Sequence, residues 1–152
     1  MTQPISRSLL TLLALLVMVL LLFGYLGFNK WRFDQHSREL VISLNQAVLA
    51  SGDAQALIDL AHDTLLQQMD SASLQGYISS VAEILGPLQS ISAVSGATAV
   101  SPLALLRGTV TASYAVELVF AAEQTRALVE LERDAGRWQV TSYVLESPLL
   151  YN

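Results

Sequence analysis

The chain has 152 residues, no cysteine and a formal net charge of −5 at pH 7, and 53% of its residues are hydrophobic. This length allows one domain of ordinary size together with a membrane anchor. The absence of cysteine excludes disulfides, thiolate metal sites and thiol catalysis. From Phe33 onward, thirteen acidic residues face five arginines. This acidic balance disfavours nucleic acid and anionic lipid headgroups as partners, because both require a basic patch.

One long apolar run covers residues 9–28, which read LLTLLALLVMVLLLFGYLGF and include no charge. Twenty helical residues rise about 30 Å, the thickness of the hydrocarbon core of a bilayer. A cleaved signal peptide would have an apolar run of only about 7–15 residues, followed by a small-x-small cleavage site. No such site follows this run. We therefore predict an uncleaved single-pass transmembrane helix over 9–29, preceded by a short tail over 1–8.

The flanks of this run predict how the chain meets the membrane. Tyr25, Trp31 and Arg32 are the expected membrane-interface residues, because aromatic and basic side chains gather where hydrocarbon meets water. Arg7 precedes the run and three basic residues follow it between 30 and 38, so the positive-inside rule is nearly balanced. A long downstream domain translocates largely regardless of flanking charge. We expect a bacterial inner-membrane protein whose C-terminal domain is periplasmic.

The first half of the domain has helical periodicity. No proline or glycine lies between residues 29 and 51, so the helix of the anchor is expected to continue straight out of the membrane. Gly52 is expected to cap its end, and Asp53 to begin a second helix that extends to Met69. Asp70 is the expected N-cap of a third helix, which Gly86-Pro87 ends.

The second half of the domain has strand periodicity. Leu88–Val94 is expected to be a short strand, and 95–107 a connection with an irregular edge strand near Ala97–Val100. Thr109–Phe120 alternates between apolar and polar residues, and so do the segments on either side of the turn at Asp134-Ala135-Gly136. The last strand is expected to place on one face Trp138, Val140, Ser142 and Val144. The fold class is therefore α+β, with amphipathic helices covering one face of a mostly antiparallel sheet.

The domain resembles a known family. Residues 51–91, SGDAQALIDLAHDTLLQQMDSASLQGYISSVAEILGPLQSI, are similar to the helical half of nuclear-transport-factor-2-like (cystatin-like) domains. The last strands, VTASYAVELVF and ALVELERDAGRWQVTSYVL, resemble the end of those domains, where a Gly-Arg-Trp-x-Val hairpin is common. Gly136, Arg137, Trp138 and Val140 occupy those positions here. The resemblance spans residues 35–147 and implies a cone in which a curved sheet wraps a long helix, often paired through its open face.

Membership of this family does not define a function, because the family includes isomerases, dehydratases and cyclases beside binding and assembly domains. Isomerase-like members need carboxylates that converge in an apolar pocket. The inward positions of the strand 109–120 include one polar residue, Tyr114, and no carboxylate. This departure from the family argues against isomerase chemistry.

The charged residues near His62 offer the best candidate for acid–base or metal chemistry. Asp59 and His62 are three residues apart and would meet on one face of a helix, next to Asp63. The simpler interpretation, which we favour, is a solvated helix face. His36, the other histidine, has no chelating spacing. We predict no catalytic residue, no metal and no cofactor.

Two further groups of side chains are candidates for binding. Tyr77, Tyr114 and Trp138 could line a ligand pocket, although aromatic residues at such positions more often belong to the core. The domain is expected to span 30–147 and a C-terminal tail 148–152. Apolar side chains at the end of the domain and in the tail could dock on a partner or on the domain's own sheet. These tail candidates are Leu145, Leu149, Leu150 and Tyr151.

The sequence thus predicts a non-catalytic accessory or assembly protein. Residues 9–29 would contact the lipid bilayer, and the domain would dock on a membrane protein or complex, with a homodimer as one form of that partner. The alternative is a small-ligand-binding domain or enzyme that uses the apolar pocket of the cone. A carboxylate buried beside Tyr77 or Tyr114 would favour the alternative.

Overall fold

The computed structural model describes residues 7–150, and the side chains of all of these except 7, 102, 104 and 105. A long helix, α1 (Arg7–Ser51), leads into three shorter ones, α2 (Gln55–Leu60), α3 (Asp63–Gln68) and α4 (Ser71–Leu85). The strands β1 (Leu88–Ala99), β2 (Val110–Phe120), β3 (Gln124–Asp134) and β4 (Arg137–Glu146) follow, with α5 (Pro102–Arg107) between the first two. A short 3-10 helix, η1 (Pro148–Leu150), ends the described chain.

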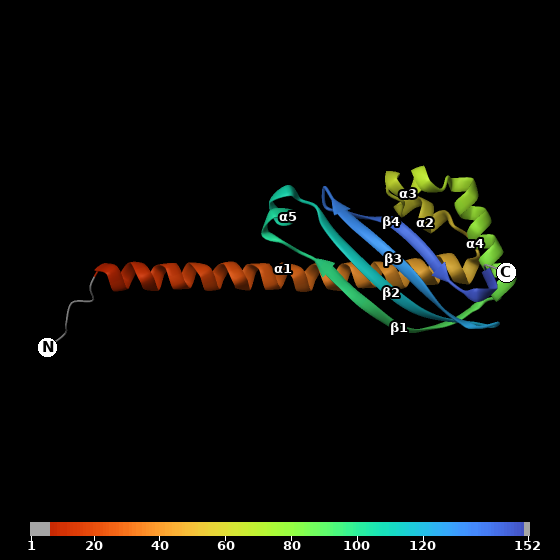
Figure 1. Ribbon diagram of the computed structural model, residues 1–152, viewed down its shortest axis with the longest axis horizontal. Helices are drawn as coiled ribbons and strands as arrows, with labels where there is room; N and C mark the ends of the chain where they lie inside the picture. The colour runs from red at the N-terminus through yellow and green to blue at the C-terminus, as the bar shows by residue number, and fades with distance from the viewer. Residues whose placement is uncertain (1–6, 151–152) are drawn as a thin grey trace.

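Helix α1 is continuous from the apolar run into the domain (Figure 1). It is long and apolar enough to cross a membrane, and its apolar half has no contact that buries it. The expected continuation of this helix beyond residue 29 is confirmed. The helix ends at Gly52, whose φ of +67° and N–H bond to the Val48 carbonyl (3.0 Å) form the expected glycine cap.

The expected second helix is not one helix. It breaks at Ala61 and His62, where the chain is extended and pairs with β4. The His62 N–H donates to the Val140 carbonyl at 2.8 Å. Its ring Nδ1 accepts from the Thr64 N–H at 3.1 Å and so caps α3. The local sequence has the periodicity of one continuous helix. The backbone hydrogen bond from His62 to Val140 of β4 interrupts that helix.

Helix α4 begins and ends as the sequence predicts. The Asp70 carboxylate accepts from the Ser73 N–H at 2.7 Å, and this bond lowers the pKa of Asp70 below its ordinary value. Gly86 ends the helix with a φ of +74°. The apolar stripe of the helix is buried, at Leu74, Ile78, Val81 and Leu85.

The four strands form one antiparallel sheet in the order β1-β2-β3-β4 (Figure 1). Strand β1 is longer than predicted, because it continues through Gly96 to Ala99 as a partner of β2. The connection after it includes the helical turn α5, which the sequence did not predict. Helix α1 packs against β1 and β2, and helices α2 and α3 against β4, so the helices cover one face of the sheet.

The inward side chains of β2 and β3 are those predicted from alternation, and all of them are buried. The prediction for β4 was wrong in part. The pairing of β3 with β4 shifts between Glu130 and Leu131, where β4 contains one extra residue. This bulge reverses which residues of β4 point into the core from that position onward. Tyr143 and Leu145 therefore point into the core, whereas Val144 is 39% exposed.

The core lies between the helices and the sheet. Val41, Leu44 and Val48 of α1 join the buried residues of α2, α3, α4, β2, β3 and β4 in one apolar cluster, against which partly buried residues of β1 pack. Trp138, which we expected to be largely buried, is only half-buried, and its ring meets Phe33 edge-on with centroids 6.4 Å apart. The chain is thus an α+β domain with a long apolar N-terminal helix and a four-stranded open sheet.

Candidate docking surface

The face of the sheet that the helices leave uncovered carries an apolar row. The register places Ser95, Ala115, Leu128 and Val144 side by side across β1, β2, β3 and β4. Leu128 is 36% and Val144 39% exposed, while Ala115 is half-buried. We call Ala115, Leu128 and Val144 the apolar row. Apolar side chains at the centre of an otherwise polar sheet face are a feature of protein-binding surfaces.

Acidic residues flank the apolar row on both sides. Glu117, Arg126 and Glu146 are paired across the strands on one side of it, and Glu130 lies on the other side with Glu132 beyond it. Arg126 contacts Glu117 at 2.7 Å, and the hydrogen bond that Arg126 donates to the Glu117 carboxylate raises the pKa of Arg126. This part of the outer face therefore carries four glutamates and one arginine, and the arginine already forms an ion pair with Glu117. This surface complements a basic partner.

A hollow of about 340 Å³ opens beside the apolar row, over β1, β2 and β3. Gly96 lines this hollow, and a Cβ there would lie 2.1 Å from the Ser113 carbonyl oxygen of β2. The φ of Gly96 is +138°, a conformation that favours glycine. The lining residues are Ser95, Gly96, Ser113, Tyr114, Ala115, Leu128, Val129 and Glu130. The hollow is large enough to accept a side chain from a partner.

Hydrogen bonds fix this surface relative to helix α1. The Asp34 carboxylate of α1 accepts from the Thr98 N–H at 2.6 Å and from the Thr98 hydroxyl at 2.5 Å, at the end of β1. One turn further along α1, the Ser37 and Tyr114 hydroxyls share a buried hydrogen bond of 2.8 Å. Near the far end of α1, Tyr143 donates to the buried Asn45 at 2.8 Å. Helix α1 therefore cannot turn relative to the sheet without breaking buried polar bonds.

Comparison of the chain with models of protein families, with curated proteins and with solved structures finds no match. The assignment of function therefore rests on the geometry of this chain.

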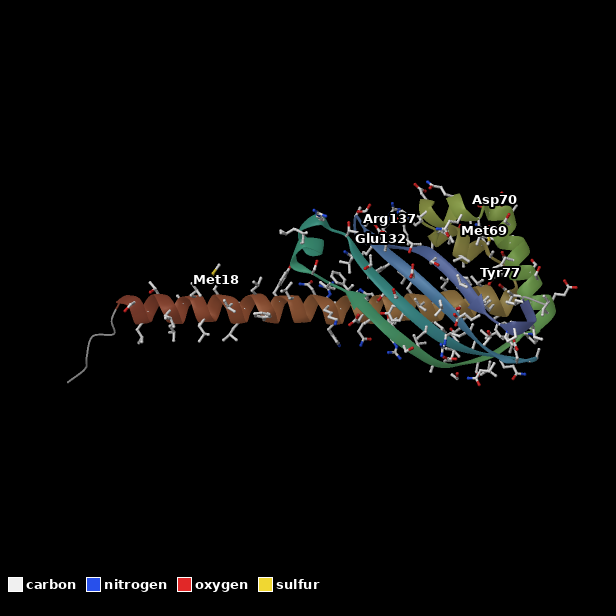
Figure 2. The ribbon with its side chains drawn as sticks, viewed as in Figure 1. Met18, Met69, Asp70, Tyr77, Glu132 and Arg137 are labelled. Atoms are coloured by element: carbon white, nitrogen blue, oxygen red, sulfur yellow. The ribbon has the colours of Figure 1, made fainter. Side chains whose placement is uncertain are left out.

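The three aromatic residues predicted to line a ligand pocket do not converge. Tyr114 is buried against α1, and burial raises the pKa of its hydroxyl. Tyr77 accepts a bond from the Leu145 N–H at 3.0 Å, at the end of the sheet far from the anchor (Figure 2). Trp138 follows Arg137, which lies toward the α5 end in the same view. The three residues serve the packing of different parts of the core.

A buried carboxylate beside Tyr114 would favour the ligand-binding alternative, and the carboxylate near Tyr114 is only half-buried. It is Asp34, whose Oδ1 accepts both bonds from Thr98. Tyr114 itself donates to the Asp34 backbone carbonyl at 3.3 Å and not to the carboxylate. These bonds hold the helix to the sheet and account for Asp34 without a ligand.

A second hollow, of about 350 Å³, lies between α1, α2 and β4. Its lining includes His36, Asp59, Arg137 and Trp138, so both signs of charge surround an aromatic ring. The sequence did not indicate this group, because its members come from three separate elements. Its volume lies within the range of small-molecule sites, about 300–1,000 Å³.

The residues around His62, considered as an acid–base or metal group but interpreted as a solvated helix face, do not form such a group. Asp59 accepts from the Gln55 side chain at 2.7 Å, and His62 caps α3 across the helix break. Among the described residues there is no group of three or more potential ligands that could hold a metal ion.

The predicted partner-binding residues of the tail have different environments. Leu145 is fully buried in the core, which corrects its assignment to a partner, because the register shift in β4 turns it inward. Leu150 packs against the core from η1, and Leu149 beside it is 42% exposed. Tyr151 lies outside the described residues. Only Leu149 of this described set offers substantial apolar surface.

The predicted membrane-interface residues are exposed on α1. Tyr25 is 62% and Trp31 59% exposed, and Arg32 is exposed beside them. Trp31 stacks at a tilt on Phe28, with ring centroids 6.2 Å apart. An aromatic pair at the end of an apolar helix is typical of the boundary between hydrocarbon and headgroups.

Proposed function

We propose that this chain is a single-pass membrane accessory protein without catalytic activity, and that α1 presents its sheet to a neighbouring membrane protein. The observation that carries the proposal is the continuity of α1 from the apolar run into the core, with no flexible linker. The hydrogen bond that Thr98 donates to Asp34 and the one that Ser37 and Tyr114 share support it, because they hold the sheet to α1 and would fix its outer face in height and rotation above the bilayer. A fixed face suits a partner in the same membrane, since the anchor removes the search through solution.

The partner that fits the outer face presents a large apolar side chain beside lysine or arginine. The apolar side chain would enter the hollow at Gly96, and the basic residues would meet Glu130, Glu132 and Glu146. A second copy fits this face less well, because each copy would bring the same glutamates to the interface and like charges repel. The partner is therefore a different protein with a basic segment close to the membrane.

The proposed location is the bacterial inner membrane, with residues 33–152 on the periplasmic side. Alkaline phosphatase fused after Asn152 is expected to be active, because this enzyme matures only outside the cytoplasm. A cytoplasmic reporter at the same site is expected to be inactive. Activity of the cytoplasmic reporter with inactive phosphatase would reverse the orientation, without changing the account of the sheet.

A photo-crosslinking residue at Leu128 or Val144 in the full-length protein tests the docking surface. We expect one discrete crosslinked product from both positions in intact cells. Ile84, which is 45% exposed on α4, is the matched control and is expected to give none. Charge reversal by Glu130→Lys with Glu132→Lys is expected to abolish the product while the protein stays in the membrane. Equal yields from Leu128 and Ile84 would refute the assignment of the face.

We also propose that the domain has the cone-shaped fold of nuclear-transport-factor-2-like proteins. The order of helices followed by an antiparallel meander, with α1 packed on the inner face, supports it. In such a cone the outer face of the sheet is available for a partner, as the docking proposal requires.

The hollow at Trp138 favours a second candidate function, the binding of a small ligand. A zwitterion suits it, because Asp59 and Arg137 offer opposite charges beside the indole. In protein carrying Trp31→Phe, Trp138 is the remaining tryptophan, and its fluorescence can be titrated with free amino acids. A saturable change that Asp59→Asn removes would support this candidate. An unchanged spectrum up to millimolar concentrations would exclude amino acids as its ligands.

A further inference from the structure

Helix α5 exposes more apolar surface than a short connection in water requires. Leu103 is 57% and Leu106 86% exposed. The connection from Ala99 to Thr109 contains three leucines and one charged residue, Arg107. Exposed leucines that cluster on one short segment mark a surface that is covered by something else.

The neighbours of α5 place it at the end of the apolar run. Lys30 of α1 lines one hollow, of about 440 Å³, together with Val100, Ser101 and Thr109. The residues on both sides of α5 therefore lie beside Lys30, and Figure 1 shows α5 at the anchor end of the sheet. The bond from Asp34 to Thr98 holds this end of β1 against α1.

The rise of α1 gives the height of α5 above the hydrocarbon. Lys30 lies about 3 Å and Phe33 about 8 Å beyond Phe28 along the helix axis, at 1.5 Å per residue. The headgroup layer adds about 5–8 Å on each side of the hydrocarbon core. A bilayer centred on the apolar run therefore brings its headgroups to the level of α5.

Basic residues gather at the same end of the domain. Arg107 ends α5, and the Arg133 guanidinium lies 4.9 Å from the centre of the Phe33 ring. Arg137 stands opposite Asp134 in the register of the β3–β4 hairpin, next to Arg133. With Lys30 and Arg32, these make five of the eight basic residues of the chain. The domain is acidic overall, but the end that faces the bilayer is not.

We infer that α5 is a second membrane contact, which enters the boundary between headgroups and acyl chains through Leu103 and Leu106. The arginines around it bind lipid phosphates, as basic residues on interfacial helices do. This inference rests on the proposed anchoring of α1. With α1 and α5 both in contact with the bilayer, the domain has two points of support and cannot swing about the anchor.

Single cysteines in the full-length protein test this inference, since the chain has no cysteine of its own. Leu106→Cys reports on α5, Met18→Cys on the anchor (Figure 2), and Ile84→Cys on an exposed position away from the membrane. Each protein is labelled with a polarity-sensitive fluorophore and reconstituted at high dilution in vesicles of phosphatidylcholine and phosphatidylglycerol. Lipids with a nitroxide near the headgroup or deep in the acyl chain serve as quenchers. The high exposure of Leu106 means that this substitution does not disturb the core.

We expect the Leu106 label to emit at shorter wavelength than the Ile84 label and to be quenched by the shallow nitroxide. The Met18 label should be quenched more strongly by the deep one. Emission and quenching at Leu106 equal to those at Ile84, with Met18 quenched, would refute the membrane contact of α5 alone. An unquenched Met18 label would refute the anchor instead. Shielding of Leu106 only at high protein-to-lipid ratio would assign α5 to contact between copies, and would also overturn the inference.

Discussion

Replacing Gly96 with alanine is expected to lower the free energy of unfolding by at least about 3 kcal/mol. The added Cβ would lie 2.1 Å from the Ser113 carbonyl oxygen and 2.8 Å from the Tyr114 Cα. Both are backbone atoms of β2, so no side chain can move aside. The φ of +138° adds strain for any residue other than glycine. A marginally stable domain would lose much of its stability through this one methyl group.

Gly76→Ala is the control for this substitution. A Cβ at Gly76 meets nothing within 4 Å, and the residue lies within helix α4. Alanine there is expected to be neutral or to stabilise by up to about 1 kcal/mol. Denaturant unfolding of the full-length protein in mild detergent, followed by tryptophan fluorescence, compares the two. Equal midpoints for both variants would mean that β1 does not approach β2 as closely as the structure shows.

Replacing Leu131 with alanine is expected to cost about 2–5 kcal/mol, as in other fully packed cores. Its side chain is 1% exposed and lies between β3 and the helices. Leu128 is three residues earlier in the same strand and points to the outer face, where it is 36% exposed. Leu128→Ala is therefore expected to cost less than about 1 kcal/mol.

The two leucine variants also separate folding from docking. Leu128→Ala should weaken crosslinking from Val144 while the domain stays folded, because Leu128 belongs to the apolar row. Leu131→Ala should lower the unfolding midpoint measured in the same detergent. A Leu128→Ala protein that is as unstable as Leu131→Ala would show that the faces of β3 are assigned the wrong way round.

The parts of the fold that follow from local chemistry could be predicted from the sequence. The apolar run, the Gly52 cap and the Asp70 N-cap each depend on neighbours within a few residues. The inward faces of β2 and β3 follow from strict alternation, because a half-buried strand repeats every two residues. These predictions needed no knowledge of which segments pair.

The parts that failed depend on distant partners. The break at His62 requires the Val140 carbonyl, 78 residues further along the chain. The reversal of faces in β4 comes from a bulge, which alternation alone does not reveal. Strand β1 passes through Gly96 because β2 pairs with it, although the local sequence reads as a loop.

The candidate docking surface was missed for the same reason. Ala115, Leu128 and Val144 lie on three strands, and they form a row only once the register is known. A signal was available in the sequence for Ala115 and Leu128, since each is an apolar residue between polar residues on the outer face of its strand. Alternation placed Val144 on the inward face instead, because it does not reveal the bulge in β4. The hollow beside them is lined by residues of β1, β2 and β3, including Gly96, and no local pattern connects these residues to the row.

The central claim is that α1 places the outer face of the sheet where a neighbouring membrane protein can bind it. A flexible Gly-Ser segment of about eight residues inserted after Asn29 tests this directly. The insertion separates the apolar part of α1 from the part that is bonded to the sheet through Asp34 and Thr98. The same segment added after Asn152 is the control. With a photo-crosslinker at Leu128, we predict that the insertion after Asn29 strongly reduces the crosslinked product, while the control retains it and both proteins stay in the membrane. An undiminished product after the insertion would contradict the claim.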